Sequence, residues 1–294
     1  MRLQRYLTHL GLASALLVGT AHASELTVGG KNYTEQLILS SMTSQYLDDL
    51  GYDIEKRDGM GSSVLRQAQE NGQVDLYWEY TGTSLIVYND IDETLSADAT
   101  YERVKALDAD KGIIWLEPSA ANNTYALAMR DDTAEEMGIE TLDDLSQAIN
   151  EDKSLTFGLD TEFYSRKDGW RPLQQAYEFR VGRDDIVRMD TGLIYSALRD
   201  GNVDVGLVFS TDGRVPAFDF RVLEDSRDFF PAYSLTPVVR EDVLETNPQL
   251  AEQLNTLSGL LDDQTMAALN ARVDVERETI ERVAESFLEK HDLI

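Results

Sequence analysis

The segment DLYWEYTGT at residues 75–83 brings aromatic rings and hydroxyl groups to the end of a predicted strand. Side chains alternate between the two faces of a strand, so Trp78 and Tyr80 point to one face and Tyr77 to the other. Tyr80 closes the strand, and a polar turn that contains Thr83 follows it. Three aromatic residues in four positions are more than a short strand needs. We assign Trp78 to the core, and from this segment alone Tyr80 is either a packing residue at the strand end or part of a ligand site.

The sequence has few residues for nucleophilic or zinc chemistry. It contains three histidines and no cysteine, and only His291 lies beyond the N-terminal leader described below. This composition argues against Ser-His and Cys-His nucleophiles, most zinc sites and disulfides. A carboxylate pair, for instance Glu35 with Glu79, is the remaining catalytic alternative and would indicate a secreted hydrolase. No nucleophile motif accompanies that pair.

Residues 1–23, MRLQRYLTHLGLASALLVGTAHA, have the pattern of a secretory signal peptide. Arg2 and Arg5 precede an apolar stretch, and the small residues Ala21 and Ala23 flank His22 in an A-x-A cleavage signal. The apolar stretch is shorter than the ~20 residues that span a bilayer. We therefore expect a soluble exported protein in a bacterial periplasm.

The chain is strongly acidic, with 54 Asp and Glu against 26 Lys and Arg. Removal of Arg2 and Arg5 with the leader leaves 24 basic residues against 54 acidic ones, a net charge of −30. Such a surface argues against nucleic acid and anionic membranes as partners. Solubility, including solubility in a salty medium, accounts for the charge, and a cationic ligand is compatible with it.

The order of predicted elements indicates an α/β fold. Short strands alternate with amphipathic helices from residue 26 to residue 209, which is typical of α/β layers with largely parallel sheets. From residue 240 onward the chain is predicted to be helical. No segment rich in Gly, Pro or Ser divides the chain.

An internal repeat at an offset of 129 residues supports two similar halves. LTVG at 26–29 matches LTFG at 155–158, and Val74-Asp75 matches Val203-Asp204. At the same offset Tyr80 corresponds to Phe209. Ligands of open α/β sheets bind beyond the carboxyl ends of the strands, so two facing halves would place Tyr80 and Phe209 on opposite walls of one cleft.

These motifs together resemble a known family over residues 25–290. They look like the substrate-binding proteins of osmoprotectant ABC importers, which carry glycine betaine, carnitine or choline. The segments that carry the resemblance are GGKNYTEQ (29–36), DLYWEYTGT (75–83), TEFYSRKDG (161–169), DVGLVFSTDGRV (204–215) and VLEDSRDFFPAYSLTPVVR (222–240). The resemblance implies a two-lobe periplasmic binding protein, a Venus flytrap of type II with two crossovers.

The resemblance also implies domains and partners. Lobe 1 would comprise residues 24–126 and 234–294, and lobe 2 residues 127–233. The ligand would be a quaternary ammonium compound, the macromolecular partner the permease subunits of an ABC transporter, and the protein a monomer without cofactor, metal or catalytic activity.

The same resemblance implies the ligand-binding residues. An aromatic box for the ammonium group would be formed by Tyr80, Tyr125, Phe209 and Tyr233. Many family members have tyrosine where this chain has Phe209, a change that keeps the ring face and loses a hydroxyl. The ligand's carboxylate would be bound by Lys31, Thr83 and Arg166.

Physical chemistry supports this division of the site. A trimethylammonium group has no N–H to donate, and each aromatic face that it contacts contributes ~0.5–2 kcal/mol. A carboxylate instead requires charged donors such as Lys31 and Arg166. Choline has no carboxylate and would leave Lys31 and Arg166 without an anionic partner. We therefore expect a betaine to be preferred. A choline binder and an amino-acid-type solute binder remain alternatives.

Overall fold

We describe a computed structural model of the chain, in which residues 25–91, 93 and 95–294 are described. The expected signal peptide, residues 1–23, lies outside the described residues. Within the described ranges no helix has both the length and the apolar character needed to cross a bilayer.

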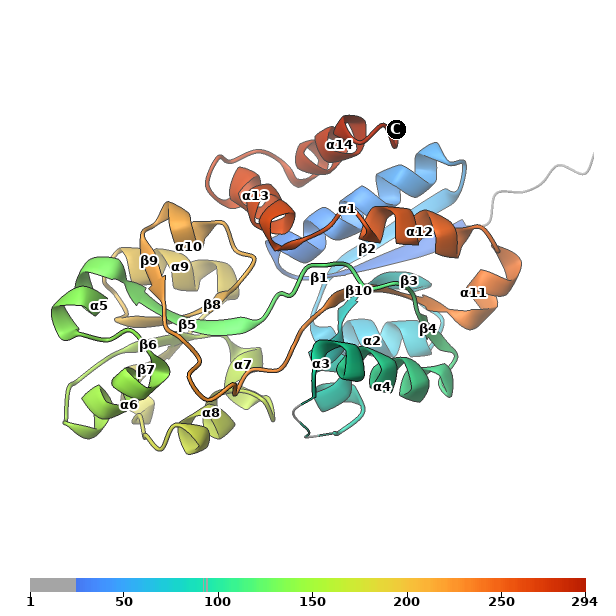
Figure 1. Cartoon of the computed structure of the whole chain (residues 1–294). Coiled ribbons are helices and arrows are strands. Elements are labelled where there is room, and N and C mark those ends of the chain that lie inside the picture. Colours follow the sequence, from blue (N-terminus) through green and yellow to red (C-terminus); the bar gives the residue numbers. More distant parts are fainter. Residues whose placement is uncertain (1–24, 92, 94) are drawn as a thin grey trace, which may run out of the picture.

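Two five-stranded sheets form the centres of two lobes (Figure 1). The first sheet has the strand order β2-β1-β3-β10-β4 and the second the order β7-β6-β8-β5-β9. The strands are β1 (Glu25–Lys31), β2 (Asp53–Met60), β3 (Leu76–Tyr80), β4 (Ile113–Trp115), β5 (Tyr125–Arg130), β6 (Phe157–Leu159), β7 (Ile186–Arg188), β8 (Val205–Phe209), β9 (Phe220–Val222) and β10 (Leu235–Arg240).

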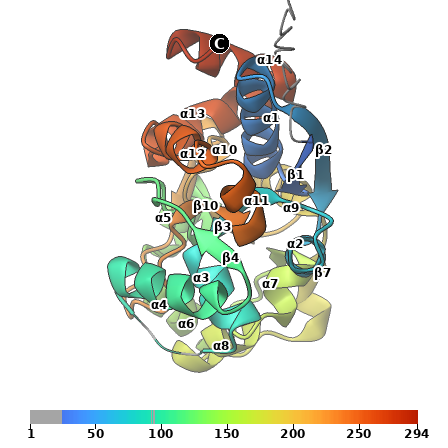
Figure 2. The ribbon, with the colours of Figure 1, turned by 90° about the vertical axis from the view of Figure 1, so that its right-hand side faces the viewer.

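Helices cover both sheets, and a C-terminal group lies over the first one (Figures 1 and 2). In chain order they are α1 (Thr34–Asp49), α2 (Ser62–Glu70), α3 (Thr81–Thr83), the π-helical turn η1 (Ser84–Tyr88), α4 (Ala97–Ala109), α5 (Asp131–Met137), α6 (Leu142–Asn150), α7 (Thr161–Ser165), α8 (Trp170–Ala176), the 3₁₀ turn η2 (Arg183–Asp185), α9 (Thr191–Arg199), α10 (Arg214–Ala217), α11 (Glu241–Thr246), α12 (Leu250–Ser258), α13 (Asp263–Asp274) and α14 (Ile280–Lys290). The predicted α/β fold is confirmed.

The internal repeat is confirmed by the two sheets. Position by position the strand orders are the same, with β1, β2 and β3 matched by β6, β7 and β8. The repeated aspartates do the same work, because Asp75 accepts a hydrogen bond from the amide of Thr27 and Asp204 accepts one from the amide of Thr156, each at 2.8 Å. In the first lobe the bond joins Thr27 of β1 to the residue that precedes β3. In the second lobe it joins Thr156, the residue before β6, to the residue that precedes β8.

The sheets are mixed, whereas the sequence predicted largely parallel ones. β10 runs antiparallel to β3, and β5 runs antiparallel to β8. The reason is the path of the chain: β5 and β10 are the first strands after the two crossings between the sheets (Figure 1). Each enters at the carboxyl edge of its new sheet, so Leu235 pairs with Tyr80 and Tyr125 pairs with Phe209.

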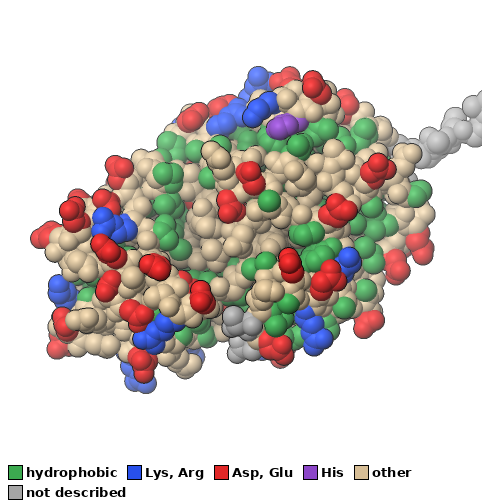
Figure 3. Space-filling model, in the orientation of Figure 1, with side chains coloured by type: hydrophobic (Ala, Val, Ile, Leu, Met, Phe, Trp, Pro, Cys, Tyr) green, Lys and Arg blue, Asp and Glu red, His purple; other side chains and the backbone are tan. Residues whose placement is uncertain are grey.

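Acidic side chains are scattered over both lobes on the face shown in Figure 3, with fewer basic ones among them. Several large aromatic residues are buried in the cores. Trp78 is 1% exposed and donates to the hydroxyl of Thr43, and Tyr177 and Tyr195 are fully buried.

Candidate functional site

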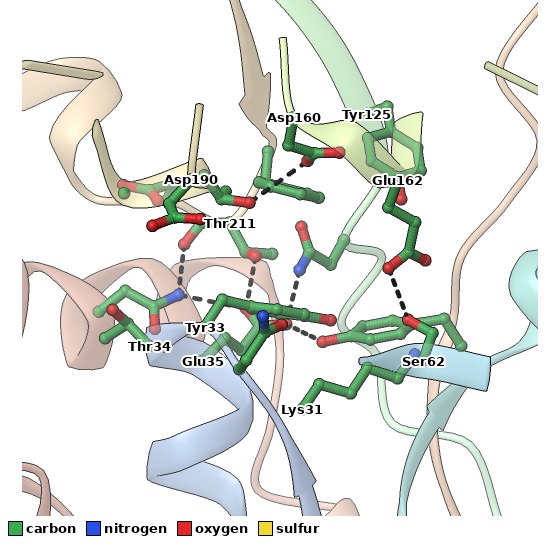
Figure 4. Close-up of a pocket in the computed structure, with 18 of the residues that line it drawn as sticks. Lys31, Tyr33, Thr34, Glu35, Ser62, Tyr125, Asp160, Glu162, Asp190 and Thr211 are labelled. Carbon is green, nitrogen blue, oxygen red and sulfur yellow. Dashed lines mark hydrogen bonds between the residues drawn. The ribbon is translucent and has the colours of Figure 1, made fainter. Parts of the chain in front are cut away.

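A cavity of about 650 Å³ lies between the two sheets, beyond the carboxyl ends of their parallel strands. Its walls come from the ends of β1, β3, β6 and β8 and from the segments that follow them. Figure 4 shows Lys31, Tyr33 and Glu35 on one side facing Tyr125, Asp160 and Thr211 on the other. The site expected from the repeat is therefore a real cavity.

Six of the seven predicted ligand-binding residues line this cavity: Lys31, Tyr80, Thr83, Tyr125, Phe209 and Tyr233. The seventh, Arg166, lies behind two of the aromatic rings, with its guanidinium carbon 5.3 Å from the centroid of Tyr125 and 5.8 Å from that of Tyr233. It lines an adjoining hollow of about 360 Å³ that shares Ser62, Glu162 and Ser165 with the main cavity.

The aromatic rings form a connected group. The centroids of Tyr125 and Phe209 are 5.1 Å apart with planes at 42°, and those of Tyr125 and Tyr233 are 5.3 Å apart at 89°. Burial raises the pKa of the Tyr80, Tyr125 and Tyr233 phenols, so all three are neutral at physiological pH. Neutral rings at differing angles around one space can present several faces to a single cation.

The turn after β3 explains the hydroxyl and glycine residues of the TGT motif. Thr81 accepts a hydrogen bond from the amide of Ser234 at 3.0 Å, which ties β3 to the chain that returns from the second lobe. A Cβ on Gly82 would lie 2.8 Å from ring carbons of Tyr233. Glycine at position 82 thus allows Tyr233 to lie against this turn, and Thr83 faces the cavity.

Tyr33 contributes an aromatic ring to the lining of the cavity and was not predicted from the sequence. Its ring is stacked on Phe209 with centroids 5.8 Å apart and planes 8° apart, and on Tyr80 at 6.5 Å and 26°. The sequence did contain a signal, because Tyr33 lies two positions after Lys31, the last residue of β1, and side chains two positions apart in an extended chain share a face. Tyr33 has extended backbone angles, so the two side chains project toward the same side.

Lys31 is buried and already paired. Its ammonium group lies 2.5 Å from Oε1 of Glu79 and 4.8 Å from the centroid of the Tyr80 ring. Glu79 also accepts hydrogen bonds from the hydroxyls of Tyr77 at 2.9 Å and Tyr88 at 3.1 Å. The main role of Glu79 in the structure is to neutralise Lys31.

Arg166 is paired as well. Its guanidinium forms a two-pronged contact with Asp168 at 2.7 and 2.6 Å, and it donates to Glu162 at 3.2 Å and to the Thr83 hydroxyl at 3.4 Å. The expectation that choline would leave Lys31 and Arg166 without an anionic partner is therefore wrong for this geometry. Lys31 and Arg166 each have a carboxylate partner before any ligand binds.

Glu35 is the second residue that the sequence reasoning did not assign to ligand binding. It is 3% exposed and accepts hydrogen bonds from Tyr80 at 2.7 Å, Asn123 at 2.7 Å, Thr211 at 2.5 Å and Asn270 at 3.2 Å. Burial raises the pKa of the Glu35 carboxyl, and these four hydrogen bonds oppose the rise.

The environments of Glu35 and Glu79 do not match those of a catalytic acid pair. Glu79 is neutralised by Lys31, and Glu35 has hydrogen-bond donors on both oxygens. In the part of the chain that the structure describes, no group of three or more His, Cys, Asp or Glu side chains has the arrangement of a metal site. The arrangement instead provides an aromatic surface, one buried carboxylate and two paired cations around one space.

Comparison with known proteins agrees with this geometry. Residues 24–290 match the sequence profile of the family described as the substrate-binding domain of ABC-type glycine betaine transport systems. A glycine-betaine-binding protein of Pseudomonas aeruginosa is 46% identical over 291 residues, which cover 97% of this chain and 94% of that protein. The glycine betaine-binding protein YehZ of Escherichia coli is 32% identical, with 96% of this chain and 95% of that protein covered.

Solved structures have the same architecture. The crystal structure of a glycine betaine/carnitine/choline ABC transporter protein superposes with a TM-score of 0.74 at 27% identity, covering 91% of this chain and 99% of that one. The apo structure of YehZ from Escherichia coli has a TM-score of 0.68 at 33% identity, covering 92% and 100% of the two chains. With this coverage the matches extend over both lobes.

Proposed function

This chain belongs to the family of substrate-binding domains of ABC-type glycine betaine transport systems, and from this premise we propose that it captures a quaternary ammonium osmoprotectant between its lobes. Glycine betaine or a related betaine is the ligand that we propose. The protein delivers it, as a monomer in the periplasm, to the permease subunits of an ABC importer, and it has no catalytic role.

The observation that carries this proposal is the group of aromatic rings in one cavity between the lobes. Tyr80 from the first sheet and Tyr125 and Phe209 from the second lie around the same space, with Tyr233 on the chain that returns to the first sheet. Trimethylammonium is a large, weakly hydrated cation that aromatic faces hold well and hydrogen-bond acceptors hold poorly. Four such faces are enough to support micromolar binding, which corresponds to about −8 kcal/mol.

The carboxylate of a betaine is assigned to Lys31, Thr83 and Arg166. Support comes from the hydrogen bond that Arg166 donates to Thr83 and from the position of Lys31 and Thr83 in the lining of the same cavity. The ligand's carboxylate would share these cations with Glu79 and Asp168, because both donors have more N–H groups than one carboxylate uses.

Closure of the lobes is the proposed signal to the transporter. We assign residues 24–126 and 234–294 to one lobe and 127–233 to the other, with the two crossings between them acting as hinges. Tyr125 and Tyr233 lie at the ends of these crossings. A ligand that contacts both lobes and both crossings stabilises the closed form through contacts that the open form lacks.

Choline is a second candidate that one observation favours. The two cations of the proposed carboxylate site are already paired with acids, and the main cavity is also lined by Asp160, Glu162 and Asp190. A site with this balance of charge tolerates a ligand that is a net cation.

The test is isothermal titration of residues 24–294 with glycine betaine and choline in parallel. Saturable binding of glycine betaine with weaker choline binding supports the proposal in full. Binding of choline alone would keep the aromatic box and reject the carboxylate assignment. Absence of heat with both ligands, combined with binding of an amino acid, would overturn the proposed ligand class.

A further inference from the structure

Glu35 is held between segments that are distant in the sequence. Its donors come from the end of β3 (Tyr80), the first crossing (Asn123), the loop after β8 (Thr211) and α13 (Asn270). The residue itself is in the first turn of α1 and lines the cavity. One carboxylate thus connects both lobes beside the aromatic rings (Figure 4).

The donors around Glu35 are those of an ionised carboxylate. Each oxygen accepts one hydroxyl and one amide N–H, which fills its hydrogen-bonding capacity without a proton on the carboxyl. The two amides turn their NH₂ groups toward Glu35 and leave the buried Oδ1 atoms of Asn123 and Asn270 without hydrogen-bond partners. Unpartnered buried carbonyl oxygens are unfavourable, so the arrangement serves the negative charge.

This negative charge has no cationic partner among the described residues, where no Lys or Arg side chain forms an ion pair with Glu35. The cations that share its cavity are committed elsewhere: Lys31 to Glu79 at 2.5 Å, and Arg214 to Asp212 at 2.5 Å and to Asp274 at 3.2 Å. A buried charge without a counter-charge is strongly unfavourable in a protein interior.

We propose that Glu35 is the fixed counter-charge for the ligand's quaternary ammonium group and makes the site select a cation over an uncharged group of the same shape. The inference rests on the proposed function. The Tyr80 hydroxyl donates to Glu35, which increases the electron density of the ring that is to receive the ammonium group. The Lys31 ammonium group already lies 4.8 Å from the centroid of that ring, so a second cation at the ring needs the negative charge of Glu35, which acts strongly in a water-poor site.

The experiment compares two ligands that differ only in charge at one atom. Glycine betaine and 3,3-dimethylbutanoate have the same shape, but a neutral carbon replaces the ammonium nitrogen in the second. Their Kd values are measured with the wild-type protein and with Glu35→Gln by titration and by competition. We expect Glu35→Gln to weaken glycine betaine binding by about tenfold or more and to leave 3,3-dimethylbutanoate binding unchanged or tighter.

Glu35→Gln is a mild substitution for the fold. The side chain keeps its length, and the unpartnered Oδ1 atoms of Asn123 and Asn270 can accept from the new amide after a rotation. Thr211→Val is the matched control, because it removes one hydrogen bond between the lobes and keeps the charge of Glu35. Thr211→Val should weaken the binding of both ligands by the same factor.

The possible outcomes separate the inference from the proposed function. If Glu35→Gln lost the same factor of affinity for both ligands, the counter-charge role would be overturned and the proposed function would remain intact. Absence of glycine betaine binding to the wild type would instead reject the proposed ligand. If Glu35→Gln does not fold, or if 3,3-dimethylbutanoate binds neither protein, Glu35→Asp is the deciding variant, because it keeps the charge. A glycine betaine affinity within about threefold of the wild-type value supports the counter-charge role, and a tenfold loss of affinity refutes it.

Discussion

The rings of Tyr33 and Phe209, one from each half of the molecule, are stacked with their centroids 5.8 Å apart and their planes 8° apart. Tyr33 follows β1 of the first sheet, and Phe209 ends β8 of the second. This spacing is normal for a pair of interacting rings, and it is less than a trimethylammonium group requires between two faces. A small separation of the lobes would therefore let the cation enter between these rings.

Tyr33→Ala is expected to weaken binding of glycine betaine by about 3- to 30-fold, because one cation–π face is lost and water enters the site. Tyr33→Phe keeps the face and should bind like the wild type. Titration of the three proteins gives the comparison. An unchanged affinity in Tyr33→Ala would mean that Tyr33 only contacts the other rings.

Tyr80→Ala and Tyr233→Ala are expected to abolish measurable binding while the protein remains folded. Each loses a ring that faces the ammonium group. Tyr233→Phe is the control: it keeps the ring and loses only the hydrogen bond to Asp168, so most of the affinity should remain. Circular dichroism checks the fold and titration the binding; intact binding in both alanine variants would reject the box.

Gly213→Ala is expected to hinder closure of the lobes. A Cβ at this position would lie 2.5 Å from the Cβ of Ala271 and 2.6 Å from the carbonyl oxygen of Ala267, both in α13. The backbone angles of Gly213 suit alanine, so the clash is between lobes and not within the loop.

The expected result is a loss of glycine betaine affinity of about tenfold, with a larger radius of gyration in solution scattering when ligand is present. The melting temperature without ligand should stay close to that of the wild type. Gly259→Ala is the matched control, since its Cβ would meet only ordinary contacts, at 3.5 Å or more. Wild-type affinity in Gly213→Ala would show that α13 moves aside freely.

Asp108 is expected to contribute to stability in a pH-dependent way. Burial raises the pKa of this carboxyl, but Arg66, Asn89 and Trp115 donate to it and hold the pKa at about 2, below its ordinary 3.8. A lowered pKa means that the stabilisation is fully present above pH 3.8 and is lost as the pH falls through 2.

Asp108→Asn removes the buried charged partner of the Arg66 guanidinium and leaves it only the half-exposed Glu70, so it should lower the free energy of unfolding by about 3–5 kcal/mol at pH 7. Urea unfolding at pH 7, 4 and 2.5 tests this. The difference between wild type and variant should shrink at pH 2.5, because the carboxyl of the unfolded chain is then protonated and the pH is close to the folded-state pKa of about 2. A difference that stays constant with pH would show that packing, and not charge, is responsible.

Much of the fold and of the site was predictable because its signals are local. Strand alternation predicted that Trp78 and Tyr80 share a face opposite to Tyr77, and the offset of 129 residues predicted two similar halves, whose sheets have the same strand order. The family motifs indicated six residues that line the cavity, and several of these lie at the carboxyl ends of strands, where α/β proteins bind ligands.

The tertiary structure alone decided which groups meet. Lys31 finds Glu79 48 residues away, and Glu35 collects donors from residues 80, 123, 211 and 270, so neither the pairing of the cation nor the unpaired charge could be deduced from spacing. The reversed direction of β5 and β10 likewise follows from where the chain re-enters each sheet. Periodicity determines which face of an element a side chain occupies; the three-dimensional path of the chain determines what that face contacts and which buried charges are left for a ligand to balance.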